Sequence, residues 1–368
     1  MNNLIYFSIG AVLDYDSSCK DNAYKHSKWF NLEWPGDNHF DSRVNNIGSP
    51  WPLAPTIYPM PATLNASTDF TTNMDLVANK IINKIIASGR QPYFYYSGGI
   101  DSTAIMVSIL KNANKDFLDQ LVVLHDNVSI EENAYFYHYY IKPRLTTQDL
   151  HTFEVTTENY KHIVIIDGEC GNQIMGSRII NAVSYQGRYD LLDTDINKVN
   201  FAKEFPTVTD FNIELIKESI KYAPVPIKTM FDFLWWVNFN FKFQDVLVRR
   251  TMTLYTKNLA AEQSLDFWNN GLARFYSEPE LQIWSLLTKD FRRKLNRKDN
   301  KLIPKQYICD YDKNTLWFAY KREQMSGPAL FKTSFQSLPI IALDSNWNKY
   351  SITDLSVRQE LGRILERC

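Results

Sequence analysis

The 368-residue chain has few cysteines, no excess of either charge and no long apolar run. Its four cysteines are scattered without a Cys-x-x-Cys pair, which argues against a zinc site or a disulfide framework and fits a reducing compartment. Forty Lys and Arg against 41 Asp and Glu give a net charge of −1, so no global field steers the molecule to nucleic acid or an anionic membrane. The chain is long enough and contains enough apolar residues to form a sizeable core, so we expect a folded, enzyme-sized protein.

Segments that would carry the chain to or through a membrane are also missing. No segment reaches the roughly 20 uncharged apolar residues of a membrane span. The first residues, MNNLIYFSIGAVLDYD, lack a basic start and run directly into acids, which is not typical of a signal peptide. We therefore expect a cytoplasmic protein without a membrane partner.

The pattern of the chain changes near residue 70. Residues 1–70 combine Pro, Asn, Asp and Trp with short apolar runs, which predicts short strands and loops. From Asn73 apolar residues recur every four positions, with Asn73 as the expected helix cap and Gly89 as the closing residue. We therefore expect an N-terminal region over 1–70 and a second domain over 71–368.

Alternating strand and helix patterns follow this first helix. The expected elements are strands over 92–96, 120–126, 151–155 and 162–167, and helices over 102–113 and 129–142. Strands that alternate with helices predict an α/β fold, in which a parallel sheet carries helices on its faces. From about residue 205 the patterns are mostly helical, and the aromatic block 230–243 is expected to be an internal helix packed on several sides.

The stretch YFYYSGGIDSTAIMVSIL, residues 93–110, joins a buried strand to a helix through two glycines. In a parallel sheet, ligands bind where the carboxyl end of a strand meets the free N–H groups of the next helix. Gly98 and Gly99 let the backbone approach phosphate oxygens closely, and Ser97 adds a hydroxyl donor. The junction therefore predicts a phosphate site, and a tight turn with ordinary Ser and Asp caps is the simpler alternative.

Three side chains at the start of the helix add to the expected site. Ser102 and Thr103 supply further hydroxyl donors, and the positive end of the helix dipole favours an anion. The Asp101 carboxylate would repel a phosphate unless a cation lies between them, so it implies Mg²⁺. The junction is not a Walker A loop, because the GxxxxGK[ST] spacing is missing.

The strand, the SGGxDS sequence and the apolar helix together resemble the pyrophosphate-loop ATPases, whose members include asparagine, GMP and NAD synthetases and tRNA-modifying enzymes. The resemblance implies the fold of the adenine nucleotide alpha-hydrolases. The residues expected to hold the phosphates of ATP are Ser97, Gly98, Gly99, Asp101, Ser102 and Thr103. His125 and Asp126, at the end of the second expected strand, are candidates to line the adenine and ribose pocket.

Three later stretches narrow the resemblance to the synthetase domain of the asparagine synthetases. IVIIDGECGNQIMGSRI, residues 163–179, is similar to that family's LSGEGxDELFGGY segment. ARFYSEPELQIW, residues 273–284, is similar to its RxDRxxMAxxxEVRxPFLD block. LWFAYKREQMSG, residues 316–327, resembles its late segment WRxKEQFSDG, and the similarity as a whole covers about residues 71–368.

This resemblance implies ATP-dependent amide formation. A substrate carboxylate attacks the α-phosphorus of ATP, pyrophosphate leaves, and ammonia or an amine then displaces AMP. Gly168 would join the nucleotide-binding residues, and Glu169 would accept a proton from the incoming amine. Lys321 or Arg322 would neutralise charge on the phosphates, and the sequence leaves the choice within this pair open.

The sequence also departs from the family pattern. Asn2 stands where the glutamine-using members have a nucleophilic Cys, so we expect no glutaminase activity, and the nitrogen to come from ammonia, an amine or a partner chain. The family's second metal-binding Asp corresponds to Asn172 and the following Glu to Gln173, which should weaken Mg²⁺ binding. Asp167 is a candidate to compensate. The expected metal ligands are therefore Asp101, Asp167 and Asn172.

Other functions remain open. The stretch between the third and fourth expected strands is much shorter than in the family, so the substrate is expected to be a small-molecule or peptide carboxylate that need not be aspartate. A pyrophosphate-loop enzyme that modifies tRNA or a nucleobase is an alternative, although the near-neutral charge counts against nucleic acid. A degenerate homologue that binds nucleotide without catalysis is another. The sequence leaves open a homo-oligomer or an ammonia-supplying partner.

Overall fold

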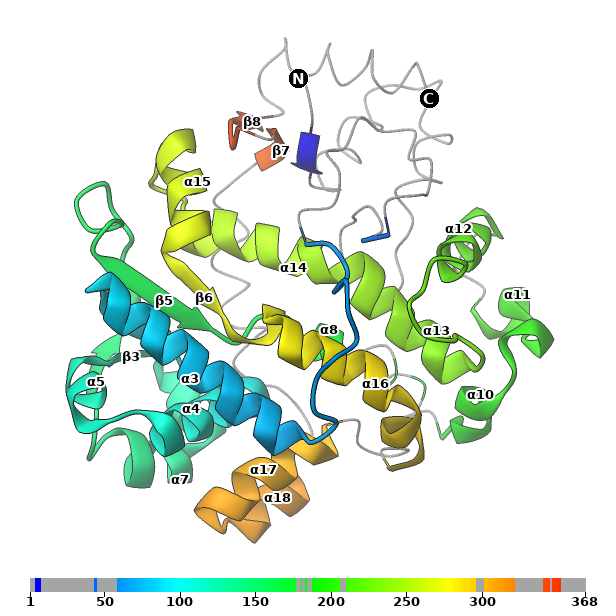
Figure 1. Cartoon of the computed structure of the whole chain (residues 1–368), viewed down its shortest axis with the longest axis horizontal. Coiled ribbons are helices and arrows are strands. Elements are labelled where there is room, and N and C mark those ends of the chain that lie inside the picture. The colour runs from blue at the N-terminus through cyan, green and yellow to red at the C-terminus, as the bar shows by residue number, and fades with distance from the viewer. Residues whose placement is uncertain are drawn as a thin grey trace. The chain divides into compact units, whose positions relative to one another are not determined.

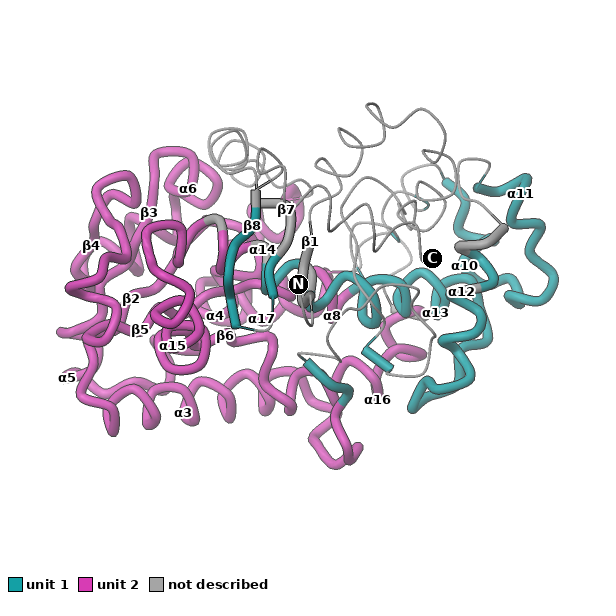
Figure 2. Tube along the Cα trace, turned by 90° about the horizontal axis from the view of Figure 1, so that it is seen from above, with its two compact units in different colours: residues 1–60, 176–249, 338–368 teal, residues 61–175, 250–337 magenta. Residues whose placement is uncertain are grey.

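The computed structural model describes part of the chain, which divides into two compact units (Figure 2). The described residues are 4–7, 43–44, 58–176, 180, 183, 187–205, 210–295, 301–321, 340–344 and 346–351. The larger unit comprises residues 61–175 and 250–337, and the smaller unit comprises residues 1–60, 176–249 and 338–368. The expected boundary near residue 70 stays a prediction.

The larger unit is built on five parallel strands. They are β2 (Gln91–Tyr95), β3 (Val122–His125), β4 (Thr146–Asp149), β5 (Ile163–Asp167) and β6 (Leu272–Arg274). Their spatial order is β4-β3-β2-β5-β6, and Tyr93 of the central strand lies opposite Val122 of β3 and Ile165 of β5. The α/β fold with a parallel sheet that the sequence predicts is therefore confirmed.

Helices flank this sheet (Figure 1). They are α3 (Phe70–Ser88), α4 (Ile100–Asn112), α5 (Lys115–Gln120), α6 (Asn127–Glu132), α7 (Ala134–Phe136), α8 (Gly171–Met175), α15 (Ala261–Asn270), α16 (Pro279–Leu295), α17 (Leu302–Asp312) and α18 (Thr315–Tyr320). α3 packs against α4 and α16, and α4 also packs against α17. None of the described helices has both the length and the apolar character to cross a membrane.

The first long helix shows how local signals set its ends. Asp69 is the N-cap of α3, because its carboxylate accepts a hydrogen bond from Thr72 N at 2.7 Å. The expectation that Asn73 is the cap is wrong, since Asn73 lies inside the helix and its side chain donates to Ser67 O at 2.7 Å. Gly89 closes the helix with a φ of 64°, as expected.

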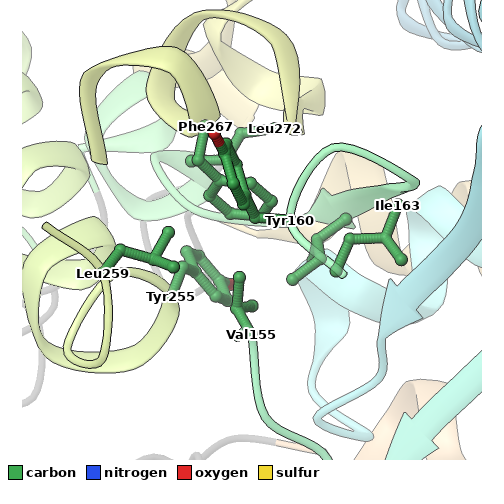
Figure 3. Close-up of a cluster of buried hydrophobic side chains, with 8 residues drawn as sticks. Val155, Tyr160, Ile163, Tyr255, Leu259, Phe267 and Leu272 are labelled. Atoms are coloured by element: carbon green, nitrogen blue, oxygen red, sulfur yellow. The ribbon is translucent and has the colours of Figure 1, made fainter. Parts of the chain in front are cut away.

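The side chains of β2 point alternately to the two faces of the sheet. Tyr93 and Tyr95 pack against an apolar cluster on one face. Figure 3 shows this cluster, which consists of Val155, Tyr160, Ile163, Ile165, Tyr255, Leu259, Phe267 and Leu272. Because successive strand side chains point to opposite faces, Phe94 and Tyr96 face the other side. There the hydroxyl oxygens of Thr103 in α4 and of Tyr96 lie 3.5 Å apart.

Several expected elements differ from those of the structure. The strand expected over 151–155 is wrong, because β4 covers Thr146–Asp149 and a 3-10 turn, Leu150–Thr152, follows it. The single helix expected over 129–142 is divided into α6, α7 and the π-helical turn Tyr137–Ile141. Asn133 caps α7 at this break, since its side chain accepts a hydrogen bond from Phe136 N.

The smaller unit contains an antiparallel sheet and a group of helices. The strands are β1 (Leu4–Phe7), β7 (Ile340–Asp344) and β8 (Lys349–Ser351), in the order β1-β7-β8. The helices include α10 (Tyr189–Asp193), α11 (Phe201–Glu204), α12 (Asp210–Ile220), α13 (Met230–Trp236) and α14 (Phe243–Arg250), whose last residue, Arg250, belongs to the larger unit. Trp235 and Trp236 of α13 are fully buried, and Trp236 Nε1 donates to Ser219 Oγ at 2.8 Å. The aromatic block is therefore buried and helical as the sequence predicts, but it is divided into α13, the π-helical segment Val237–Lys242 and the start of α14.

Candidate functional site

The topological switch point of the parallel sheet lies between β2 and β5. The chain passes from β2 to β3 and β4 on one side, and returns to β5 on the other side of β2. In open α/β sheets, ligands bind beyond the carboxyl ends of the strands at such a point. The Ser97-Gly98-Gly99 turn follows β2, and the glycine turn 168–171 follows β5. Both turns that the sequence singles out therefore flank the switch point.

The turn after β2 requires a glycine at position 98. Gly98 has a φ of 69°, in the left-handed region, and a Cβ atom there would lie 2.1 Å from the Ser129 carbonyl oxygen. Ser129 is itself fixed by Asp126, the N-cap of α6, whose Oδ1 accepts a hydrogen bond from Ser129 N at 2.6 Å. The backbone of the turn therefore lies directly against α6.

Hydroxyl groups close this turn from within. Ser97 Oγ and Ser102 Oγ lie 2.9 Å apart. Thr103 is fully buried, and its hydroxyl donates to Gly98 O at 3.4 Å. α4 begins at Ile100, so its first N–H groups follow the turn directly. Ser102 and Thr103 thus support the shape of the turn, and their expected contacts with a phosphate stay predictions.

The two glycine turns meet where Gly171 faces Asp101. A Cβ atom on Gly171 would lie 2.4 Å from Cγ of Asp101, so the glycine makes room for the carboxyl group. A Cβ atom on Gly168 would lie 3.6 Å from Ser102 N, which brings a second glycine of this turn beside the start of α4. The Tyr276 hydroxyl donates to Asp101 O at 3.0 Å. The structure therefore brings Asp101 and Gly168, both expected at the nucleotide, to one place.

Asp101 is paired with a cation that the sequence does not single out. Lys301 Nζ lies 2.5 Å from Asp101 Oδ2, and the two side chains are 14% and 18% exposed. Lys301 is the N-cap residue of α17, which packs against α4. The second carboxylate oxygen, Asp101 Oδ1, is buried and has no hydrogen-bond partner among the described residues. One oxygen of Asp101 is thus bound to an ammonium group and the other is left to a ligand.

Two carboxyl groups lie at the carboxyl end of β5. Asp167 is 2% exposed, and its Oδ1 accepts a hydrogen bond from Glu169 N at 3.2 Å. Burial, and then the negative charge of Glu169, raise the pKa of Asp167 to about 7, against the opposing charge of Arg274. Arg250 Nε lies 2.8 Å from Glu169 Oε1. The guanidinium group balances Glu169, whereas Asp167 is partly protonated near neutral pH.

Two polar atoms at the carboxyl ends of β2 and β3 lack hydrogen-bond partners within the described part of the chain. The Tyr95 hydroxyl is one of them, and burial raises the pKa of Tyr95 while the charge of Arg250 opposes this effect. His125 Nδ1 is the other, although His125 Nε2 lies 3.0 Å from the Tyr137 hydroxyl. Buried polar atoms of this kind are the groups that a polar ligand can satisfy.

Lys321 forms a buried ion pair beside the turn after β2. Lys321 Nζ lies 2.6 Å from Glu132 Oε1, and the side chains are 9% and 0% exposed. A Cβ atom on Gly99 would lie 3.7 Å from the same Glu132 oxygen, so the pair adjoins the Ser-Gly-Gly turn. Lys305 of α17 donates to Lys321 O at 3.0 Å and fixes the end of α18. The cation expected to neutralise phosphate charge therefore lies close to the turn expected to bind phosphate.

Two further residues expected at the site are Arg322 and Asn172. Arg322 lies outside the described residues, so the choice between Lys321 and Arg322 stays open. Asn172 lies in α8, directly after Gly171. No group of three or more His, Cys, Asp and Glu side chains gathers into a metal-binding arrangement in the part of the chain that the structure describes. The set of Asp101, Asp167 and Asn172 stays a prediction for the metal.

Four charged residues of this site were not predicted from the sequence. They are Glu132, Arg250, Arg274 and Lys301. Arg274 lies within the stretch 273–284 that carries the family resemblance, and Arg250 lies in LVRRTMTLYTKNLAAE, residues 247–262, which precedes that stretch. This position is the one signal that could have marked them. Glu132 and Lys301 lie in charged segments without a motif, so only the fold brings them to the switch point.

Comparison with known proteins does not assign the chain to a family. No model of a protein family matches the chain, and no curated protein matches it. We therefore argue the function from the residues of this site.

Proposed function

We propose that the protein is an ATP-dependent ligase that joins a carboxylate to ammonia or an amine through an acyl-adenylate, releasing AMP and pyrophosphate. The observation that carries this proposal is the close approach of Gly171 to Asp101, with a Cβ position only 2.4 Å from the carboxyl carbon. It supports the proposal because the turn expected to bind phosphate and the turn bearing a carboxylate, Glu169, meet at one switch point. Such an arrangement suits a reaction between the phosphates of a nucleotide and a second substrate.

The turn after β2 supports the nucleotide half of the proposal. Gly98 and Gly99 carry no side chain, and the N-terminus of the 13-residue helix α4 follows them. Backbone N–H groups and the helix dipole at this position favour the charge of a leaving pyrophosphate. Lys321, held by Glu132, adds a positive charge beside the same turn. These groups would stabilise charge that develops as the bond to the α-phosphorus breaks.

The turn after β5 supports the amine half of the proposal. Glu169 is 21% exposed at its side chain, so it is accessible to a ligand, and Arg250 holds one of its oxygens at 2.8 Å. A charged carboxylate in a fixed position can accept a proton from an attacking ammonium or amine. Glu169 would then make the nitrogen nucleophilic, and Arg250 would orient the carboxylate.

Mg²⁺ fits this site through a single carboxylate. Asp101 Oδ1 is buried without a hydrogen-bond partner among the described residues, which makes it an available oxygen ligand. Magnesium is commonly held by one or two carboxylates together with the phosphates of the substrate. In our proposal Asp101 would hold Mg²⁺ through Oδ1, and the ion would neutralise negative charge on the phosphates.

The nucleotide product tests this proposal. The protein is incubated with ATP, Mg²⁺, ammonia and one carboxylate at a time, beginning with aspartate, and the nucleotides are separated by chromatography. With one of the carboxylates, we expect AMP, pyrophosphate and the amide to form in equal amounts. Formation of ADP and phosphate instead would show that the substrate is phosphorylated and would contradict adenylation.

A further inference from the structure

Lys301 affects the charge of the Ser97-Gly98-Gly99 turn, which is expected to bind phosphate and is called the phosphate turn below. A carboxylate beside bound phosphates requires a cation, because two anions repel each other in a partly buried place. In the structure an ammonium group already lies 2.5 Å from Asp101 Oδ2, with Lys301 only 14% exposed at its side chain. We infer that Lys301 is a built-in cation of the phosphate turn, which lets the turn bind a pyrophosphate group without a divalent metal.

The position of Asp101 is fixed on several sides. Tyr276 binds its carbonyl oxygen, and Gly171 leaves only enough room for its carboxyl group. Asp101 also lies in the first turn of α4, where the helix dipole favours a negative charge. The backbone of Asp101 is therefore held, and its carboxyl group packs directly against Gly171, so its charge is balanced best in this position.

The position of Lys301 is fixed through α17. Lys301 precedes the first residue of α17, and that helix packs against α4. One turn further on, Lys305 is 1% exposed and donates to Lys321 O at 3.0 Å, which holds the start of the helix in place. An ammonium group has three N–H donors, so it can bond a carboxylate and a phosphate oxygen at the same time.

This inference rests on the proposed phosphate site and adds a statement about its metal requirement. Asp101 Oδ2 is bound by Lys301, and Oδ1 is the oxygen left for a metal. A divalent ion at Oδ1 would then strengthen binding of the anion but would not be required for it. Without Lys301, the binding of pyrophosphate by this turn would depend entirely on the metal.

Calorimetric titration with inorganic pyrophosphate tests the inference. Full-length protein is titrated in EDTA and again in Mg²⁺. We expect the wild type to bind in both, and Lys301→Met to weaken binding in EDTA by about tenfold or more, the equivalent of about 1.4 kcal/mol. The loss in Mg²⁺ should be smaller, because the metal takes over the neutralisation. Lys301→Arg should retain most of the binding in EDTA.

Three further variants keep the test independent of folding. Lys80→Met is the matched control, because Lys80 forms exposed ion pairs with Glu278 and Glu280 in the same unit, and its binding should equal that of the wild type. If Lys301→Met does not fold, Asp101→Asn combined with Lys301→Met is compared with Asp101→Asn alone, which keeps the lysine. The double variant should bind pyrophosphate in EDTA about tenfold more weakly than Asp101→Asn, and equal binding by the two would overturn the inference.

The possible results separate the inference from the proposed ligase activity. Binding that needs Mg²⁺ in the wild type, or binding in EDTA that Lys301→Met leaves unchanged, overturns the inference and leaves the ligase proposal standing. Binding in EDTA that depends on Lys301, without any carboxylate giving AMP, supports the inference and contradicts the ligase. Absence of pyrophosphate binding in both conditions overturns both.

Discussion

Asp101 and Lys301 are 200 residues apart in the sequence, yet the carboxylate and the ammonium group lie 2.5 Å from each other. A second pair of the same kind, Glu132 and Lys321, lies 189 residues apart and adjoins the same turn. Both lysines come from the segment around α17 and α18, and both acids come from the strand-helix units that surround β2. The charge of the proposed phosphate site is therefore assembled by the fold from two distant parts of the chain.

The turn after β2 should not tolerate a side chain at position 98. Gly98→Ala adds a Cβ atom 2.1 Å from Ser129 O at a φ of 69°. We expect it to lower the free energy of unfolding by about 3 kcal/mol or more. The matched control is Gly89→Ala, because Gly89 has a φ of 64° with nothing within 4 Å of the added atom. That change should cost only about 1–2 kcal/mol. Urea denaturation compares the two, and equal losses would contradict the close packing against α6.

The meeting of the two glycine turns gives a prediction about binding. Gly171→Ala places a Cβ atom 2.4 Å from Asp101 Cγ and should displace the carboxyl group, so we expect pyrophosphate or nucleotide binding to fall by at least about tenfold. Gly89→Ala is the control, because Gly89 lies at the end of α3 with nothing within 4 Å of the added atom, and it should leave binding unchanged. Equal binding by both variants would show that the Asp101 position does not matter to the ligand.

The ion pair between Lys321 and Glu132 should contribute to stability as well as to charge. Removing one member of a buried pair typically costs about 3–5 kcal/mol, so we expect Lys321→Met to lower the free energy of unfolding by an amount in this range. Lys115→Met removes a pair to Asp119 whose side chains are 84% and 55% exposed, and should lower the free energy of unfolding far less. A double variant with Glu132→Gln should recover part of the loss. A loss for Lys321→Met as small as for Lys115→Met would contradict a buried pair.

Asp167 should make the stability of the protein depend on pH. Its pKa is raised from 3.8 to about 7 in the folded protein, so the folded state holds a proton that the unfolded state releases. The resulting stabilisation is complete below a pH of about 3.8 and is lost as the pH rises through 7. Asp167→Asn removes this titration. Between pH 5 and pH 8, an interval of about three pH units, the urea midpoint of Asp167→Asn should therefore fall less than the urea midpoint of the wild type. Parallel profiles for the two proteins would contradict the raised pKa.

Those parts of the fold with a clear apolar pattern could be predicted from the sequence. β2 and β5 are buried apolar runs, and the helix after Ser97-Gly98-Gly99 follows from its apolar residues. β4 was misplaced because its residues, Thr146–Asp149, are polar and partly or fully exposed at the edge of the sheet. β6 was missed because it has only three residues, too few for a pattern to show.

The candidate site, too, could be predicted only in part from the sequence. Its two glycine turns follow from local sequence, because a strand that breaks into Gly-Gly before a helix has few structural explanations. The partners of its carboxylates do not, since Lys301, Lys321 and Arg250 reach them only through the packing of distant helices. Local sequence also placed Ser102 and Thr103 at the ligand, whereas the structure shows their hydroxyls bonded within the turn.

The most direct test of the proposed activity is ATP–pyrophosphate exchange with Mg²⁺ over a panel of carboxylates, with the wild type compared with Glu169→Gln. Adenylation is reversible before the amine attacks, so one carboxylate should support exchange in both proteins, while amide formation by Glu169→Gln falls by about 100-fold or more. Exchange that no carboxylate supports, in a protein that still binds ATP, would contradict the account.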